Sequence, residues 1–152
     1  MTEMHTIVVG IDGSEASVKA LRFALQEAGS HHAQLKVVMA WSVPPLAYGA
    51  GWSVPINVDD YAKIAQSELD KTLAAAGSAD SDVTVTQLLR QGQPADILCA
   101  EAKGADLLVV GSRGLGGFRG LLLGSVSQQC ANHAPCPVVI IPHERGEKAP
   151  DG

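Results

Sequence analysis

The fold of this chain is decided first by the stretch Thr6-Ile7-Val8-Val9-Gly10-Ile11, which is followed directly by Asp12-Gly13-Ser14. Unbroken apolar runs of this length are typical of strands that are buried on both faces of a parallel sheet. The glycine-containing turn interrupts the run, and from Ser14 to about Gly29 apolar residues recur at helical spacing. Asp12 or Ser14 can cap the start of such a helix, and Gly29 stands where helices usually end. The N-terminal part of the chain therefore predicts a strand followed by a helix.

The remainder of the chain alternates between strand and helix patterns in the same way. Strands that alternate with helices predict a parallel sheet, because each right-handed crossover places its helix on a face of the sheet. We therefore expect one α/β domain over residues 1–143, followed by a disordered C-terminal tail at 144–152. Further strands are predicted at residues 35–41, 83–89, 106–111 and 137–141, and further helices at 61–76, 94–104 and 125–133.

The connection at residues 42–58 is long for an α/β unit and has no periodicity. Loops of this length are often lids or interaction surfaces. Its aromatic residues Tyr48 and Trp52 either fold over a ligand, contact a partner or pin a surface loop, and these alternatives stay open.

The composition disfavours several classes of protein. Hydrophobic residues make up 46% of the 152 residues and aromatic residues only 4%, so the core must be aliphatic. The net charge of −5 argues against a nucleic-acid-binding surface, which needs a clustered basic face. The N-terminus lacks a signal-peptide pattern, and no apolar run approaches the ~20 residues that span a bilayer. Three cysteines without metal-ligand spacing fit a reducing compartment, as small apolar fillers of the core. We expect a cytoplasmic protein with no nucleic-acid and no membrane partner.

The most informative motif is Gly111-Ser112-Arg113-Gly114, followed after nine residues by Gly124-Ser125-Val126-Ser127. Glycines allow backbone N–H groups to approach phosphate oxygens closely, and the second half of the motif opens a helix whose N-terminus attracts anions. The serine hydroxyls add donors, and Arg113 and Arg119 are the only cations of the loop. A glycine-rich loop can also be a mere connector. That alternative is weakened because this loop follows a buried strand, carries arginine and leads into a helix.

Several other motifs are missing. The chain has no GxxxxGK[ST] sequence, and the dinucleotide pattern that starts at Gly114 has Arg119 at the position of its third glycine. No Ser-His-Asp order, nucleophile elbow or HExxH motif is present, so we predict no catalytic residue. No ligand cluster is present either: His31 and His32 have no carboxylate or cysteine at ligand spacing, so we interpret them as solvated turn residues and predict no metal site.

Taken together, the motif G-x2-G-x9-G-[S/T], formed by Gly111, Gly114, Gly124 and Ser125, resembles the nucleotide-binding signature of the universal stress protein family. The stretch from Ile7 to Ser14 is also similar to the first strand and loop of that family. The resemblance covers residues 5–141. It implies an open five-stranded parallel sheet with strand order 3-2-1-4-5 and helices on both faces, the adenine nucleotide alpha hydrolase-like arrangement, and a homodimer.

The resemblance also implies a set of nucleotide-binding residues. Asp12 would face adenine or ribose, although a role as the cap of the first helix is equally open. Arg113 stands at a variable position of the motif. By position, the adenosine pocket would be formed by Gly10, Ile11, Asp12 and Ala40, with Val110 beneath the nucleotide and with Gly111, Arg113, Gly114, Gly124, Ser125, Val126 and Ser127 around ribose and phosphates.

The last predicted strand is apolar and would lie at the edge of the sheet. An unprotected edge invites pairing with a second copy of the chain, most often about a two-fold axis. We expect Val138, Val139, Ile140 and Ile141 to form a homodimer interface, as the resemblance also implies, the alternative being an edge covered by the tail.

These patterns favour a sensor or buffer that binds an adenine nucleotide, ATP or cyclic AMP, with Mg²⁺ accompanying ATP. Two arginines, no lysine and few acidic residues in the loop favour a monophosphate such as cyclic AMP over ATP. One alternative is a slow ATP hydrolase or nucleotidyl enzyme of the same superfold. A second is a structural dimer that binds no nucleotide.

Overall fold

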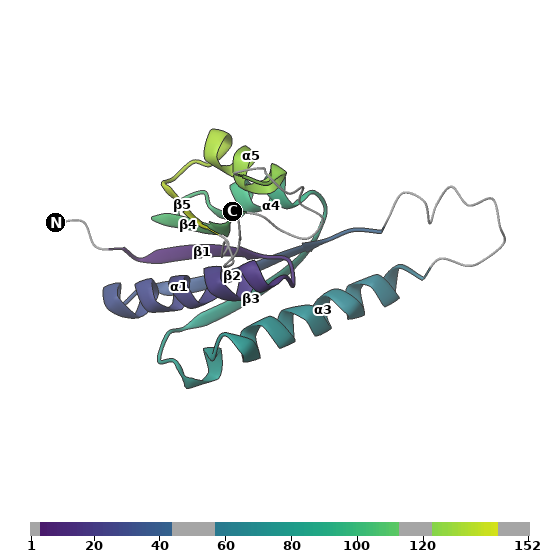
Figure 1. Ribbon diagram of the computed structural model, residues 1–152, viewed down its shortest axis with the longest axis horizontal. Coiled ribbons are helices and arrows are strands. Elements are labelled where there is room, and N and C mark those ends of the chain that lie inside the picture. Colours follow the sequence, from purple (N-terminus) through teal and green to yellow (C-terminus); the bar gives the residue numbers. More distant parts are fainter. Residues whose placement is uncertain (1–3, 44–56, 113–122, 143–152) are drawn as a thin grey trace, which may run out of the picture.

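The computed structural model describes residues 4–43, 57–112 and 123–142, and shows a five-stranded parallel sheet (Figure 1). The strand order is β3-β2-β1-β4-β5, which confirms the predicted order. The strands are β1 (Thr6–Ile11), β2 (Gln34–Trp41), β3 (Val85–Gln91), β4 (Leu107–Gly111) and β5 (Val138–Ile141).

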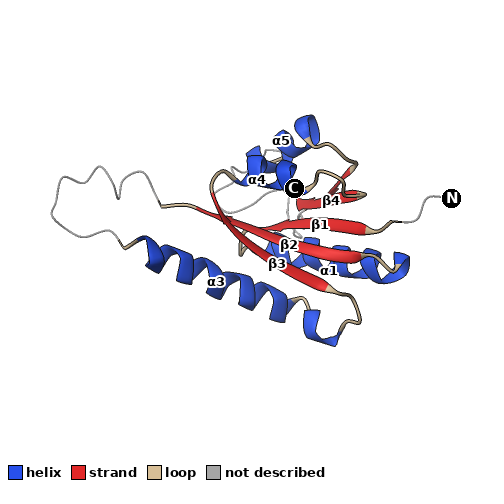
Figure 2. Ribbon diagram, turned by 180° about the vertical axis from the view of Figure 1, so that it is seen from behind, coloured by secondary structure: helices blue, strands red, loops and turns tan. Residues whose placement is uncertain are grey.

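Helices cover both faces of the sheet. They are α1 (Glu15–His31), α3 (Val58–Ala75), α4 (Pro94–Glu101) and α5 (Ser125–His133), with a 3₁₀ turn η1 (Ser78–Asp80) after α3. The helices α1 and α3 pack on one face and α4 and α5 on the other, so α1 lies in front of the sheet in Figure 1 and behind it in Figure 2. The connections that contain α1 and α3 lead from β1 through β2 to β3, and those that contain α4 and α5 lead in the opposite direction across the sheet, to β4 and then β5. Because such connections are right-handed, the two helix pairs lie on opposite faces.

The central strand β1 shows why the sheet is stable. Its alternate side chains point to opposite faces. Ile7 and Val9 pack beneath α1 and α3, whereas Val8 packs beneath α4, and all three are fully buried. A strand that is buried on both faces needs an unbroken apolar sequence, as predicted.

The end of α1 differs from the sequence-based prediction. The helix does not stop at Gly29 but continues to His31, and it is closed by His32 in the left-handed region with φ 54°. Gly29 lies inside the helix, where a Cβ atom would be 3.7 Å from Val83 Cγ2. The prediction that His31 and His32 occupy a turn is therefore wrong for His31, which is the last residue of the helix, and right for His32, and both residues are exposed as expected.

Other element boundaries shift by a few residues. The predicted strand at 83–89 begins at Val85, because the N–H of Val83 donates to Ser81 Oγ at 3.1 Å in the preceding turn. It extends to Gln91 because β2 remains available for pairing as far as Trp41. The helix predicted from residue 61 begins one turn earlier, at Val58. The helix predicted at 94–104 ends at Glu101.

Two predicted segments fall wholly or partly outside the described residues. Tyr48 and Trp52 belong to the undescribed range 44–56, and the predicted tail lies in the undescribed range 143–152. Within the described ranges, none of the helices is long and apolar enough to cross a membrane.

Candidate functional site

The carboxyl ends of β1 and β4 form the switch point of the sheet. The chain leaves β1 towards α1 on one face and leaves β4 towards α5 on the other, and ligands of open α/β sheets bind in the crevice between such connections. Val9 pairs with Val109, so the residues after each of them reach the same edge. The structure thereby brings together the predicted residues Gly10, Ile11, Asp12, Val110 and Gly111.

Ala40 joins this group from the neighbouring strand. Met39 is the register partner of Ile11, so Ala40 lies beside Asp12 at the carboxyl edge. Both residues are half-buried. Ala40, near the end of β2, therefore lies at the edge of the sheet where the site is predicted.

Asp12 is the centre of the turn between β1 and α1. Its Oδ1 accepts hydrogen bonds from Ser14 N–H at 3.0 Å, Ser14 Oγ at 2.5 Å and Ser17 Oγ at 2.6 Å. The backbone N–H of Asp12 donates to Ser17 Oγ at 2.7 Å. The N-cap of α1 is Ser14 rather than Asp12. Asp12 therefore fixes the turn through one carboxylate oxygen.

Gly13 brings a residue to the site that the sequence analysis missed. Its φ of 88° favours glycine, and a Cβ atom there would be 3.0 Å from Oε2 of Glu68 in α3. Glu68 directly precedes the buried Leu69 in α3. This position next to a buried residue was the sequence signal that could have pointed to Glu68. The site thus has a second carboxylate at the β1–α1 turn.

Gly10 has a packing role at the edge of the site. A Cβ atom at this position would lie 2.6 Å from Leu98 Cδ1 and 2.8 Å from Cδ2. Leu98 of α4 is buried, and it packs over β1 because Gly10 has no side chain. The glycine therefore allows the close approach of helix and strand, and its predicted contact with a ligand stays a prediction.

Ser127 holds the two ends of the β4–α5 connection together. Its Oγ lies 2.9 Å from the carbonyl oxygen of Ser112 and 3.1 Å from that of Gly124, and it is buried. The Gly124 N–H also donates to the carbonyl of Ser112, at 2.6 Å. The predicted role of Ser127 as a donor to phosphate differs from this arrangement, because its single proton is shared between two main-chain carbonyls.

The N-terminus of α5 is the best anion-binding feature of the site. Gly124 is the N-cap, with φ −77° and ψ 172°, and no side chain caps the helix among the described residues. Ser125 is exposed and Val126 is half-buried in the first turn. The first N–H groups of a helix have no intrahelical acceptor, and they carry the positive end of the helix dipole. Backbone donors are therefore directed out of α5 where the motif predicts them.

The remaining predicted residues, Arg113 and Gly114, lie outside the described residues, as does Arg119. Within the described part of the chain, no group of three or more His, Cys, Asp or Glu side chains is arranged to hold a metal ion.

Comparison with known proteins agrees with this geometry. The model of the universal stress protein family matches residues 3–142. The chain belongs to the universal stress protein family. A universal stress protein of Mycolicibacterium smegmatis is 37% identical over 139 residues, which cover 89% of this chain and 45% of the relative. A universal stress protein of Thermus aquaticus is 36% identical over 138 residues, covering 90% of this chain and 97% of the relative. Our universal stress protein therefore spans about half the length of the mycobacterial relative and nearly all of the Thermus one.

Solved structures of the family share the fold. A universal stress protein crystallised in complex with cAMP is similar to this chain with a TM-score of 0.66 and 30% identity. The similarity covers 92% of this universal stress protein and 98% of the solved chain.

Proposed function

We propose that this universal stress protein binds an adenine nucleotide at the carboxyl edge of β1 and β4, and acts as a sensor or buffer rather than a catalyst. The observation that carries the proposal is the N-terminus of α5, which begins at Gly124-Ser125 without a side-chain cap among the described residues. It lies at the edge where the turn at Asp12 ends β1. An anion-binding helix end opposite an acidic turn suits a ligand with one anionic and one hydrogen-bonding end.

The solved relative supports the choice of ligand class. That protein was crystallised with cAMP and is 30% identical to this chain over nearly its whole length. Adenosine would lie towards Ile11, Asp12 and Ala40, and phosphate towards Gly124, Ser125 and Val126. Gly111, Arg113 and Gly114 would complete the phosphate side.

Charge favours a nucleotide with few phosphates. Glu68 adds a second carboxylate beside that of Asp12 at the β1–α1 turn, and it forms a long, exposed ion pair with Lys71 at 3.9 Å. Like charges in a partly desolvated site repel strongly, and each further phosphate of the ligand adds to this cost. Cyclic AMP is therefore the preferred ligand in this proposal. ATP would need Mg²⁺ to offset its charge.

The proposal assigns no catalytic residue. Asp12 is a carboxylate at the turn where a hydrolase would need its base, and its Oδ1 already accepts three hydrogen bonds from the turn. A carboxylate held in this way is a positioning group rather than a proton acceptor. We therefore propose binding without turnover.

The edge strand β5 carries the proposed dimer. All four of its residues are half-buried, and beyond β5 the sheet has no further strand among the described residues. An apolar edge of this kind suits a second copy of the chain.

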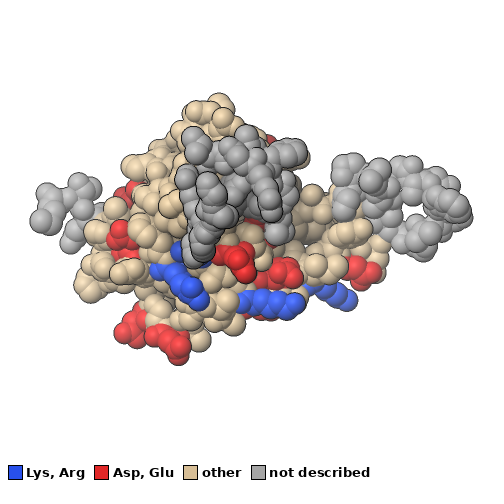
Figure 3. All heavy atoms as spheres, viewed as in Figure 1, with Lys and Arg blue, Asp and Glu red and all other residues tan. Residues whose placement is uncertain are grey.

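We expect no nucleic-acid partner. On the face shown in Figure 3, basic and acidic side chains lie interspersed.

A substitution at Ser125 tests the site with little risk to the fold. Ser125→Asp places a negative charge in the first turn of α5, where acidic residues stabilise a helix. The same charge repels a bound phosphate, so the affinity for cyclic AMP should fall at least about tenfold, or about 1.4 kcal/mol. Isothermal titration of nucleotide-stripped protein with cyclic AMP, AMP and ATP, with and without Mg²⁺, measures this.

The matched control is Ser81→Asp. Ser81 lies in the turn before β3, at the opposite edge of the sheet, and an aspartate there can still accept the hydrogen bond from Val83 N–H. This variant should bind nucleotide like the wild type. Equal affinity of both variants for cyclic AMP would refute the assignment of the site. Phosphate release from ATP would favour the hydrolase alternative. The absence of any binding by the wild type would favour a structural dimer.

A further inference from the structure

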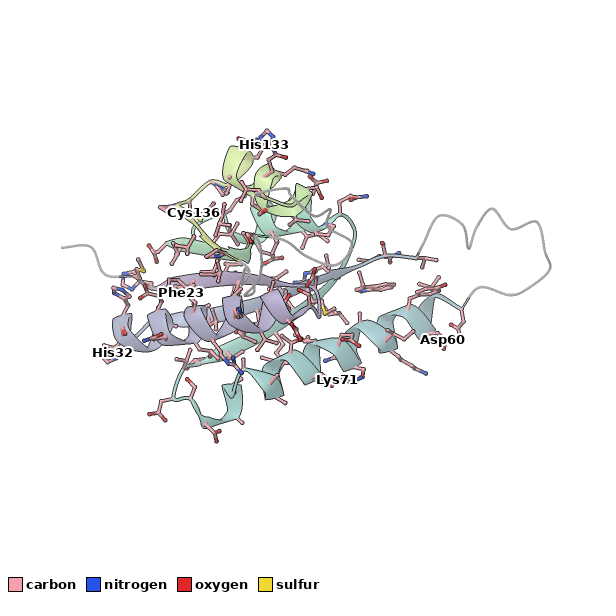
Figure 4. The ribbon with its side chains drawn as sticks, viewed as in Figure 1. Phe23, His32, Asp60, Lys71, His133 and Cys136 are labelled. Carbon is pink, nitrogen blue, oxygen red and sulfur yellow. The ribbon has the colours of Figure 1, made fainter. Side chains whose placement is uncertain are left out.

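Three thiols gather beneath and between α4 and α5, away from the nucleotide site. Cys99 lies in α4, Cys130 in α5 and Cys136 shortly before β5, and all three belong to one apolar cluster. Cys130 is fully buried, whereas Cys99 and Cys136 are half-buried. Figure 4 shows Cys136 beside the end of α5, where His133 is labelled.

A pocket of about 300 Å³ opens between these two helices. Asp96, Cys99 and Lys103 line it from α4 and the turn that follows, and Gln129 and His133 line it from α5. None of these residues belongs to the predicted nucleotide site. The pocket therefore gives solvent a route to Cys99 that does not pass the nucleotide.

Burial disfavours the thiolate form of two of the three thiols. Burial raises the pKa of Cys130 to about 12, so this thiol stays protonated at neutral pH. Burial also raises the pKa of Cys136. Since the thiolate is the nucleophile, neither group attacks an electrophile readily. Among the three, Cys99 is the thiol that lines the pocket.

Opposite charges line the pocket with Cys99. Asp96 lies three residues before Cys99 in α4, on the same side of the helix, and Lys103 lines the pocket from the turn that follows α4. Within the described part of the chain, neither Asp96 nor Lys103 forms an ion pair. This order of acid, thiol and amine is complementary to a small molecule that carries both an ammonium and a carboxylate group.

We propose that Cys99 is a modification site, at which a small zwitterionic disulfide of the amino-acid type exchanges to form a mixed disulfide in the α4–α5 pocket. The Cys99 proton passes to solvent, and the thiolate attacks one sulfur of the reagent. The sulfur–sulfur bond of the reagent breaks, and its other half leaves as a thiolate. Cys99 is thereby oxidised by the disulfide, and one half of the reagent is reduced. Burial disfavours the thiolates of Cys130 and Cys136, so we expect the adduct to persist until an added thiol reverses it.

The test is the intact mass of the full chain after incubation with three disulfides of similar size. L-cystine is zwitterionic at both ends, cystamine is dicationic and 3,3′-dithiodipropionate is dianionic. We expect a single adduct, formed at least about threefold faster with cystine than with either other reagent, as partly screened charges allow. Asp96→Asn should lower the preference for cystine over the dianion, and Lys103→Gln the preference for cystine over the dication.

Cysteine variants locate the adduct. Cys99→Ser and Cys99→Ala should both abolish it, whereas Cys136→Ser should still be modified at the wild-type rate. An adduct that persists without Cys99, a loss of two hydrogens that indicates an internal disulfide, or equal rates with all three reagents would overturn the proposal. None of these measurements depends on nucleotide binding.

Discussion

The contact between Gly10 and Leu98 allows a quantitative test of how β1 and α4 are held together. In the variant Gly10→Ala, the new methyl group would lie 2.6 Å from Leu98 Cδ1, 2.8 Å from Cδ2 and 3.3 Å from Cγ. Carbon atoms in contact prefer a separation of about 3.5–4.0 Å. Leu98 or the whole of α4 must therefore move by roughly 1 Å.

The surroundings of Leu98 make this movement costly. The side chain is only 4% exposed, and it belongs to the cluster that contains Val8, Val38 and Val110. Overpacking of such a core costs about 1–3 kcal/mol of unfolding free energy. For a domain of this size, each kcal/mol lowers the melting temperature by about 2–4 °C. Urea denaturation followed by circular dichroism measures the free energy directly.

A double-mutant cycle separates packing from any other effect of Gly10. Leu98→Ala alone should cost about 2–5 kcal/mol, because it leaves a cavity. In that background the alanine methyl at position 10 occupies vacated space, so its cost should fall by at least about 0.5 kcal/mol. Gly29→Ala is the matched control, since its Cβ would be at an ordinary 3.7 Å from Val83 and alanine favours the helix interior. An unchanged stability of Gly10→Ala, or an equal cost in both backgrounds, would refute this reasoning.

Two further predictions concern acid stability and assembly. Hydrogen bonds from the backbone N–H groups of His5 and Thr6, at 2.7 and 3.0 Å, lower the pKa of Asp106 below its usual 3.8. Since the folded pKa is depressed, the carboxylate stabilises the fold above that pH, and its contribution is lost as the pH falls through the folded pKa. The stability difference between wild type and Asp106→Asn, from urea denaturation, should therefore shrink below pH 3.8, and a difference that does not change with pH would contradict the assignment. If β5 pairs with a second copy, sedimentation equilibrium should give twice the 15.8 kDa mass of the chain, and a single-chain mass at all concentrations would contradict the dimer.

Much of the fold could be predicted from the sequence because it depends on local patterns. The apolar run from Thr6 to Ile11 predicted the central strand, and the alternation of strand and helix patterns predicted the parallel sheet. The glycine motif placed Gly124 and Ser125 at the start of α5, where the structure has them. Such signals are carried by residues that are neighbours in the chain, and each element expresses its own period.

Only the tertiary structure decided what individual residues do at the site. Gly10 was predicted from the family resemblance to line a pocket, yet its missing side chain admits Leu98, which lies far along the sequence. Glu68 of α3 approaches Gly13, and the Ser127 hydroxyl donates to the main-chain carbonyls of Ser112 and Gly124. These contacts join residues that are distant in the chain and leave no periodic trace in it, so packing alone determines them.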